Sequence, residues 1–380
     1  MTTEHYINRA ITSDIIQKLA AKQSKIIVIY GSRQVGKTTL VKTIIQHTNY
    51  RVLYLNGDDR HDIEKIKTRD TIQLTQLVAG YELLFIDEAQ KISDIGINLK
   101  ILYDNCRSLK LIVTGSSALE LANTVAESLA GRTHTYYLYP LSFLELSTQF
   151  ETAYLKRSID TYLIYGSYPD VLQYSAQADK KAYLQDLSES YLYKDVLEIG
   201  SIRYSRKLKA LLTLLAFQIG SEVSYSEIGQ QVGLSHHTVI DYIQLLTQAF
   251  IIKPLYGFSR NLRKEITKKP KLYFHDLGIR NALIGNFAPL NMRSDSGALW
   301  ENFLVMERTK RNHYQKHYCN AYFWRTYTGA ELDYIEDYDG TLHGYEFKWR
   351  KSSKIPERWR DNYSQSFQCI NSHNFLEFIL

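Results

Sequence analysis

The stretch Gly31-Ser32-Arg33-Gln34-Val35-Gly36-Lys37-Thr38 decides how the first part of this chain folds. It fits G-x-x-x-x-G-K-[ST], the pattern of a phosphate-binding loop. The apolar run at 26–30 leads into it and predicts a buried strand, and a helical pattern of apolar residues follows it. In that context backbone N–H groups and a helix N-terminus face the phosphates. A chance Gly turn before a helix would not explain both flanks.

The loop predicts a site for ATP and Mg²⁺. We expect Lys37 to reach the β- and γ-phosphates and the Thr38 hydroxyl to ligate Mg²⁺. The expected nucleotide-binding residues are Gly31, Ser32, Arg33, Gln34, Val35, Gly36, Lys37, Thr38 and Thr39.

Two adjacent acids end the apolar run at 83–86, which predicts a buried parallel strand. An acid at the carboxyl end of such a strand lies where doubly wound sheets bind ligands. We expect Asp87 to hold Mg²⁺, largely through water, and Glu88 to orient and activate the attacking water. The alternative is that the two acids only cap the next helix.

Polar residues after the strand expected at 109–114 are candidates to sense the γ-phosphate. Ser116 is the first choice and Thr114 the second, with helix capping by Ser116 or Ser117 as the alternative. Arg132 follows a helical pattern and is a candidate arginine finger for its own site or a neighbour's. A surface salt bridge is the other explanation for Arg132.

Length and composition limit the classes of protein to which this chain can belong. The 380 residues suggest two to four domains, and no apolar run reaches the roughly 18 residues that a membrane span needs. We therefore expect no membrane partner. The polar N-terminus does not read as a signal peptide, and Cys106, Cys319 and Cys369 form no disulfide or metal spacing. These features favour a cytoplasmic location.

The chain resembles the prokaryotic AAA-superfamily ATPases. The resemblance is carried by the loop motif at 31–39, Phe-Ile-Asp-Glu-Ala-Gln at 85–90, Val-Thr-Gly-Ser-Ser at 113–117, Leu-Ala-Gly-Arg at 129–132 and the stretch 139–146. It implies a parallel sheet in which the sensor strand separates the phosphate-loop strand from the Asp-Glu strand. The subgroup of these ATPases that the chain resembles also carries a C-terminal domain of unknown function. The resemblance therefore extends over nearly the whole chain.

The expected fold class is α/β, with four units along the chain. We expect an AAA-type ATPase core at 1–145, a helical lid at 146–204, a winged helix-turn-helix at 205–280 and a small restriction-endonuclease-like domain at 281–380. The lid assignment follows from the resemblance. Gly166-Ser167-Tyr168-Pro169-Asp170 marks a break between its helices.

The winged helix is predicted from three helical patterns and a hairpin. The third helix, at 236–246, could enter a major groove of DNA. The strand at 250–252 and the hairpin out to 274 would form the wing, which carries Arg260, Arg263, Lys264, Lys268, Lys269 and Lys271. Clustered cations favour contact with DNA phosphates, although winged helices also serve as protein-packing modules and a charge run is often a solvated face.

In the last domain, alternating strands are expected at 331–335 and 344–349. Asp333 in one, with Glu346 and Lys348 in the other, resembles the active site of restriction-endonuclease-like enzymes. The resemblance implies that Asp333 and Glu346 bind Mg²⁺ and that Lys348 positions or activates water, with Glu301 as a further member. The Pro that usually precedes the Asp is absent, since Glu331-Leu332 stands there, and an ordinary hairpin with a polar face is the alternative.

We therefore expect an ATPase that is coupled to DNA binding or processing and can assemble as a homo-oligomer. Metal-dependent nuclease chemistry in the C-terminal domain is a further candidate activity. The alternative is an ATP-dependent switch or scaffold that binds protein partners and carries an inactive nuclease fold. A small-molecule kinase is disfavoured, because nothing in the sequence suggests an acceptor pocket.

Overall fold

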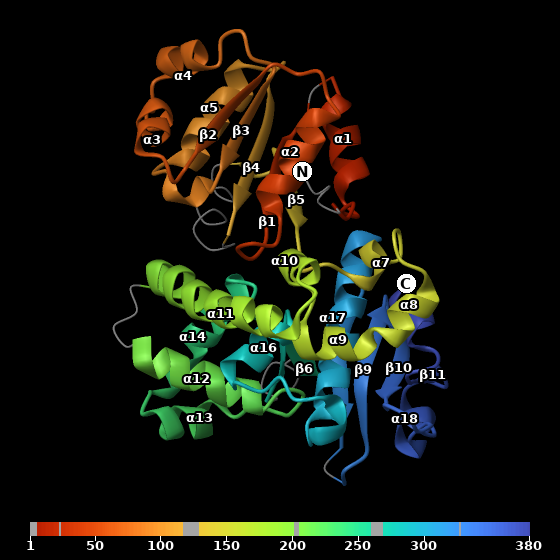
Figure 1. The fold of residues 1–380 in the computed structure, drawn as a ribbon. Coiled ribbons are helices and arrows are strands. Elements are labelled where there is room, and N and C mark those ends of the chain that lie inside the picture. Colours follow the sequence, from red (N-terminus) through yellow and green to blue (C-terminus); the bar gives the residue numbers. More distant parts are fainter. Residues whose placement is uncertain (1–5, 23, 117–128, 201–204, 260–268, 327) are drawn as a thin grey trace.

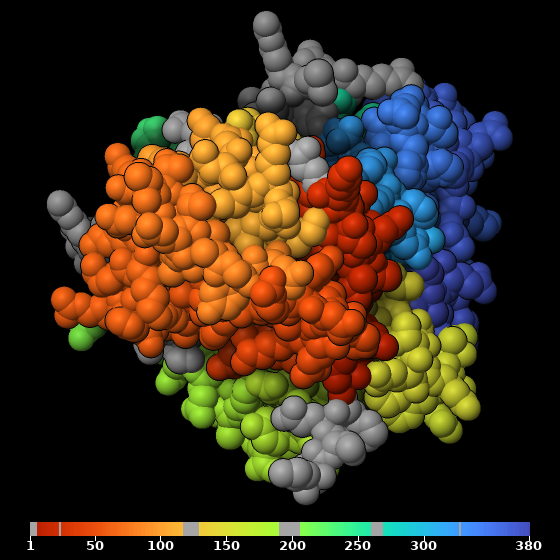
Figure 2. Space-filling view, turned by 90° about the horizontal axis from the view of Figure 1, so that it is seen from above, coloured from red at the N-terminus to blue at the C-terminus, as the bar shows by residue number. Residues whose placement is uncertain are grey.

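The computed structural model describes residues 6–22, 24–116, 129–200, 205–259, 269–326 and 328–380, with the backbone alone for 190–200 and 205. Figure 1 shows an N-terminal α/β lobe, in red and orange, above a layer of helices and a second sheet. Figure 2, seen from above, shows this lobe covering much of the helical layer, with the C-terminal part in blue along one side.

The N-terminal lobe is built on a five-stranded parallel sheet with the order β2-β3-β4-β1-β5. The sensor strand β4 therefore lies between the phosphate-loop strand β1 and the Asp-Glu strand β3, which confirms the expected order. Parallel neighbours bring all five carboxyl ends to one edge. The strands are β1 (Ile26–Tyr30), β2 (Val52–Asn56), β3 (Leu83–Asp87), β4 (Lys110–Gly115) and β5 (Thr133–Tyr137).

Helices cover both faces of this sheet, which explains why the inner strands β1 and β3 are continuous apolar runs. Ile27 and Ile29 of β1 pack on one face with α1 (Thr12–Ala20) and α2 (Lys37–Gln46). Ile26 and Val28 pack on the other face, whose helical elements are α3 (Arg60–Ile66), α4 (Thr71–Leu77), the short η1 (Ala89–Lys91) and α5 (Ile95–Asn105).

Short helices follow the sheet and lead into a long one. The first, α7, starts with a capping box in which Ser142 and Glu145 bind each other's backbone N–H groups. These helices are α7 (Phe143–Leu146), α8 (Thr152–Arg157), α9 (Ile159–Tyr165), α10 (Pro169–Gln173) and α11 (Gln177–Gly200). In Figure 1 the loops at the carboxyl edge of the sheet face α10 and α11.

Three helices and a hairpin come next, in the order that the winged-helix prediction requires: α12 (Ser205–Phe217), α13 (Tyr225–Val232), α14 (His236–Gln248), β6 (Ile252–Gly257) and β7 (Lys271–Phe274). Gly233 ends α13 in the left-handed conformation, which favours glycine. The strand expected to include Phe250 starts later, because Phe250 itself has φ +57° and turns the chain.

The second sheet is mixed, with the order β11-β10-β9-β8-β6-β7. The hairpin β6–β7 belongs to this sheet, because β6 pairs in parallel with β8. The remaining elements are α16 (Leu277–Leu283), η2 (Leu290–Met292), α17 (Ser296–Tyr314), β8 (Asn320–Arg325), β9 (Glu331–Tyr338), β10 (Thr341–Phe347), α18 (Glu357–Asn362), β11 (Phe367–Ile370) and α19 (Phe375–Ile379).

The apolar cores follow the same division. The N-terminal sheet has a core on each face, whereas one large cluster runs through Leu163, Leu212, Tyr273 and Phe303. The stretches expected as lid, winged helix and C-terminal domain therefore share one core. None of the described helices combines the length and the apolar character needed to cross a membrane.

Candidate nucleotide-binding site

The phosphate loop leaves β1 at the carboxyl edge of the sheet and enters α2. Gly36 has φ +95°, which favours glycine, and a Cβ on Gly31 would lie 2.3 Å from the carbonyl oxygen of Leu138. Lys37 is buried, and its Nζ donates to the carbonyls of Gly31 (2.8 Å) and Ser32 (2.9 Å). The loop thus holds the ammonium group of Lys37 at the carboxyl end of β1, where the motif requires it.

Asp87, the last residue of β3, accepts hydrogen bonds from hydroxyl groups on three other elements. Thr38 Oγ1 donates to its Oδ2 over 2.7 Å, Thr114 Oγ1 donates to its Oδ1, and the Tyr54 hydroxyl lies 3.5 Å from Oδ2. Burial and the neighbouring Asp87 carboxylate raise the pKa of Tyr54 to about 12. Thr38 and Asp87 fit Mg²⁺, which takes few protein oxygens together with water and substrate phosphates.

Glu88 follows directly and has φ +50°, an uncommon backbone conformation for a side-chain-bearing residue. Its backbone N–H donates to Thr114 Oγ1 over 3.3 Å. Its Oε2 accepts from Gln90 Nε2 at 2.6 Å, and the same nitrogen donates to Ser116 Oγ at 2.9 Å. Thr114, the second choice as sensor, touches Asp87, while Ser116 is joined to Glu88 through Gln90.

Arg132 lies at the start of β5, and its carbonyl accepts from Ile26 N at the start of β1. The phosphate loop leaves the other end of β1. Because β1 and β5 are parallel and in register, the whole strand separates Arg132 from the loop of its own chain. Its side chain pairs with Asp104, with Nε and Oδ1 3.1 Å apart. Arg132 thus forms the surface salt bridge that was its alternative explanation, and a role as an arginine finger stays a prediction.

Three residues that the sequence analysis missed bind the loop from elsewhere. Buried Arg9 donates from Nη1 to the Val35 carbonyl (2.8 Å) and from Nε to Glu145 (2.9 Å). The Tyr168 hydroxyl donates to Ser32 Oγ (2.9 Å), and Tyr183 donates to Gln34 Oε1 (2.7 Å). The helical layer therefore touches the phosphate loop directly. Only the chain break at 166–170 hinted at Tyr168, and nothing local marked Arg9.

The C-terminal set also comes together. The β9–β10 pairing ends at Tyr334 and Tyr345, and Asp333 and Glu346 are the next residues of the two strands, so alternation places both side chains on the same face. Phe347 N donates to Asp333 Oδ2 (2.8 Å), and Lys348 Nζ lies 2.6 Å from Glu346 Oε1. Glu346 Oε2 is buried and has no hydrogen-bond partner within the described part of the chain. No trio of His, Cys, Asp or Glu in the described ranges is arranged to hold a metal ion.

A lysine from the hairpin enters this set. Lys271 Nζ lies 2.9 Å from Glu301 Oε1 and 3.8 Å from Asp333 Oδ1, and Tyr273 donates to the same Glu301 oxygen at 2.6 Å. Burial raises the pKa of Glu301 to about 7 and also raises that of Asp333. Burial by itself would lower the pKa of Lys271, but Glu301 and Asp333 outweigh it and raise that pKa.

These contacts correct the expected basic wing. Lys271 is buried and paired with carboxylates, so it does not face a phosphate backbone. Lys269 pairs with Glu227 on the surface, with Nζ and Oε1 3.1 Å apart. The other four cations of the expected wing, Arg260, Arg263, Lys264 and Lys268, lie outside the described residues.

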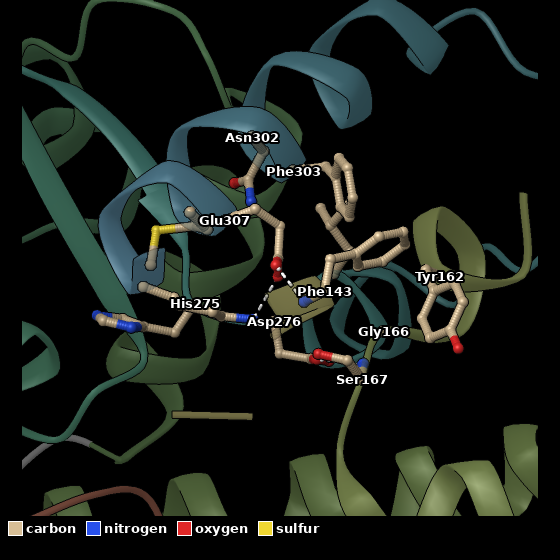
Figure 3. Close-up of a pocket in the computed structure, with 12 residues that line it drawn as sticks. Phe143, Tyr162, Gly166, Ser167, His275, Asp276, Asn302, Phe303 and Glu307 are labelled. Carbon is tan, nitrogen blue, oxygen red and sulfur yellow. Dashed lines mark hydrogen bonds and ion pairs between the residues drawn. The ribbon is translucent and has the colours of Figure 1, made fainter. Parts of the chain in front are cut away.

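A pocket lies between α7, α9, α16 and α17, and the residues that line it include Phe143, Tyr162, Asp276 and Glu307 (Figure 3). Its carboxylates already have internal donors. Glu307 accepts from Phe143 N (2.6 Å) and Lys310 Nζ (2.7 Å), and Asp276 accepts from Ser167 N (2.7 Å). We therefore interpret this pocket as a structural junction between the helices α7, α9 and α16 and the C-terminal helix α17.

Comparisons with known proteins agree with this geometry. Residues 23–147 match the family described as AAA domain, which agrees with the P-loop fold of this part of the chain. Residues 156–290 and 296–365 match two families described as domains of unknown function, DUF8612 and DUF4143.

Similar whole chains come from bacteria and archaea. An uncharacterised protein of Mycobacterium tuberculosis is 24% identical over 344 residues, which is 90% of this chain and 74% of that protein. One from Methanocaldococcus jannaschii is 26% identical over 322 residues, 80% of this chain and 70% of the other. The solved Walker-type ATPase paby2304 of Pyrococcus abyssi has a TM-score of 0.50 at 11% identity, covering 74% of this chain and 97% of its own. That likeness supports the fold alone.

Proposed function

We propose that this protein hydrolyses ATP with Mg²⁺ in its N-terminal domain and that hydrolysis is coupled to DNA held by the C-terminal part. The observation that supports hydrolysis most directly is the contact between Thr38 and Asp87 (2.7 Å). It joins the end of the phosphate loop to the acid that ends the Asp-Glu strand β3, across the intervening strand β4, at the edge where parallel sheets bind ligands.

Each residue of the nucleotide site has its own proposed role. Lys37 binds the β- and γ-phosphates, and Thr38 and Asp87 hold the metal ion, directly or through water. Bound Mg²⁺ supplies charge neutralisation for the phosphates. Glu88 orients the attacking water and accepts its proton, and Ser116 donates to the γ-phosphate.

Steady-state hydrolysis and nucleotide binding, measured in parallel, test this proposal. We expect Lys37→Ala to lose ATP binding, and Glu88→Gln to bind ATP normally while its kcat falls by about 100-fold or more. Full turnover in Glu88→Gln, or hydrolysis without any divalent cation, would contradict the assigned roles.

Coupling to DNA is proposed from the C-terminal set. Asp333 and Glu346 share one face of two paired strands, and Lys348 adjoins them. One buried oxygen of Glu346 has no hydrogen-bond partner among the residues that the structure describes. Two carboxylates and a lysine are groups with which nucleases bind a metal ion and activate water. Here each carboxylate has an internal cation nearby, so the metal ion would have to compete with Lys271 and Lys348.

This part is tested with single- and double-stranded DNA, Mg²⁺ or Mn²⁺, and with or without ATP. We expect DNA binding that weakens steeply with salt, since phosphate contacts release counterions. Cleavage that is lost in both Asp333→Ala and Lys348→Ala would assign a nuclease. Binding without cleavage would leave a DNA-associated ATPase, and a lack of binding would contradict the DNA proposal.

The second candidate function is an ATP-dependent switch or scaffold that binds a protein partner. The observation that favours it is Lys271, whose ammonium group lies against Glu301 and Asp333 where a nuclease would need a metal ion. It predicts nucleotide-dependent association with a protein and no affinity for DNA. Tight DNA binding in gel-shift experiments would count against it.

A further inference from the structure

Gln90 has contacts that neither the motif nor the comparisons assign. Its Nε2 donates to Glu88 Oε2 (2.6 Å) and to Ser116 Oγ (2.9 Å). These partners come from different strands, because Glu88 follows β3 and Ser116 follows β4. One amide nitrogen thus joins the residue proposed as general base to the residue proposed as γ-phosphate sensor.

The chemistry of the three groups fixes the direction of these bonds. An ionised carboxylate only accepts, so the amide must turn its N–H₂ group towards Glu88. Ser116 Oγ accepts the second N–H, which leaves the hydroxyl hydrogen of Ser116 for another acceptor, such as a phosphate oxygen.

The position of Gln90 has a cost that a purely structural residue would avoid. Its Oε1 is buried and has no hydrogen-bond partner among the described residues. A buried polar atom without a partner is unfavourable and in native proteins often marks a functional constraint. The amide keeps both bonds to the site while its oxygen stays unsatisfied.

We propose that Gln90 is a positioning residue for ATP hydrolysis, which holds Glu88 and Ser116 in one hydrogen-bonded unit. This inference rests on the proposed ATPase function. Bridged in this way, the group that activates water and the group that detects the γ-phosphate adopt their working positions together. A geometry fixed before the reaction lowers its barrier without further reorganisation.

The experiment compares Gln90→Ala and Gln90→Glu with Gln73→Ala, which removes an exposed amide from α4. We expect both Gln90 variants to lose about 10- to 100-fold in kcat with KM and ATP affinity unchanged. Gln90→Glu keeps the size but sets a second carboxylate against Glu88, so its loss should be at least as large. Gln73→Ala should behave as wild type.

A double-mutant cycle separates positioning from a general structural effect. If the bridge exists, Gln90→Ala and Ser116→Ala should be non-additive, with the double variant losing little more than the stronger single one. Three results would overturn the inference. The first is a double variant whose loss in kcat equals the product of the two single losses, and the second is an unchanged kcat in Gln90→Ala. The third is a loss of kcat in Gln90→Ala that a loss of thermal stability accompanies and explains. Wild-type protein that binds but never hydrolyses ATP would instead refute the proposed function on which it rests.

Discussion

Lys271 Nζ lies 2.9 Å from Glu301 Oε1, and this ion pair joins strand β7 to the long helix α17. Only 5% of the Lys271 side chain and 15% of the Glu301 side chain are exposed. In the sequence Lys271 belongs to a run of cations, whereas in the fold its near neighbours are carboxylates. The pair stabilises the C-terminal part only while both partners are present, because a single buried charge is costly.

The first prediction concerns the stability of this pair. Lys271→Met leaves Glu301 and Asp333 buried without their shared cation, so we expect the free energy of unfolding to fall by about 3–5 kcal/mol. Denaturant unfolding measures this change. The matched variant Lys269→Met removes an exposed cation and should unfold like wild type. Equal stability of the two variants would show that Lys271 is not held as described.

The second prediction concerns pH. The pKa of Glu301 is raised from 4.5 to about 7, chiefly by burial. Between these values the folded protein keeps a proton that the unfolded chain releases, so this group makes stability fall as pH rises from about 4.5 to 7. The contribution is at most ~3 kcal/mol. Melting temperatures across this range should decline less steeply in Glu301→Gln than in wild type or in the exposed control Glu357→Gln; identical slopes would refute this origin.

The third prediction concerns Thr114. Its hydroxyl donates to Asp87 Oδ1, and Thr114→Val keeps the shape while removing that donor. Because groups that orient a metal ligand affect metal binding, we expect the Mg²⁺ concentration for half-maximal hydrolysis to rise by about 10-fold. A Mg²⁺ titration at saturating ATP measures it. Thr75→Val, on the exposed face of α4, serves as the control, and an unchanged Mg²⁺ requirement in Thr114→Val would refute the role.

The fourth prediction concerns Arg132, which lies at the end of β1 away from its own phosphate loop. If it completes a neighbour's site, Arg132→Ala should bind ATP normally and lose hydrolysis by about 1000-fold. Asp104→Ala breaks the same ion pair but keeps the arginine, so it should retain activity. Turnover that persists in Arg132→Ala would remove this role. So would a wild-type protein that stays monomeric and hydrolyses ATP at a rate proportional to protein concentration, because a shared site requires two chains.

Local sequence patterns were sufficient to predict the central elements of the N-terminal domain. The order of strand, Gly-rich loop and helix is encoded within one short stretch, and the acids at 87–88 follow an apolar strand that both faces of a sheet must bury. The AAA-type resemblance also implied the sheet order that places β4 between β1 and β3. Local patterns also predicted the helix α14 and the paired strands β9 and β10.

Contacts between distant parts of the chain could not be predicted in this way. Arg9 reaches Glu145, 136 positions away, and Tyr168 reaches Ser32, also 136 positions away. The inclusion of β6 and β7 in the C-terminal sheet turned Lys271 from an expected phosphate contact into the partner of Glu301. Hydrophobic periodicity tells which side of a strand is buried but not which strand becomes its neighbour. The sequence by itself therefore determined the phosphate loop and its acids, and only the tertiary structure, by pairing strands and packing helices far apart in the chain, decided which charges meet.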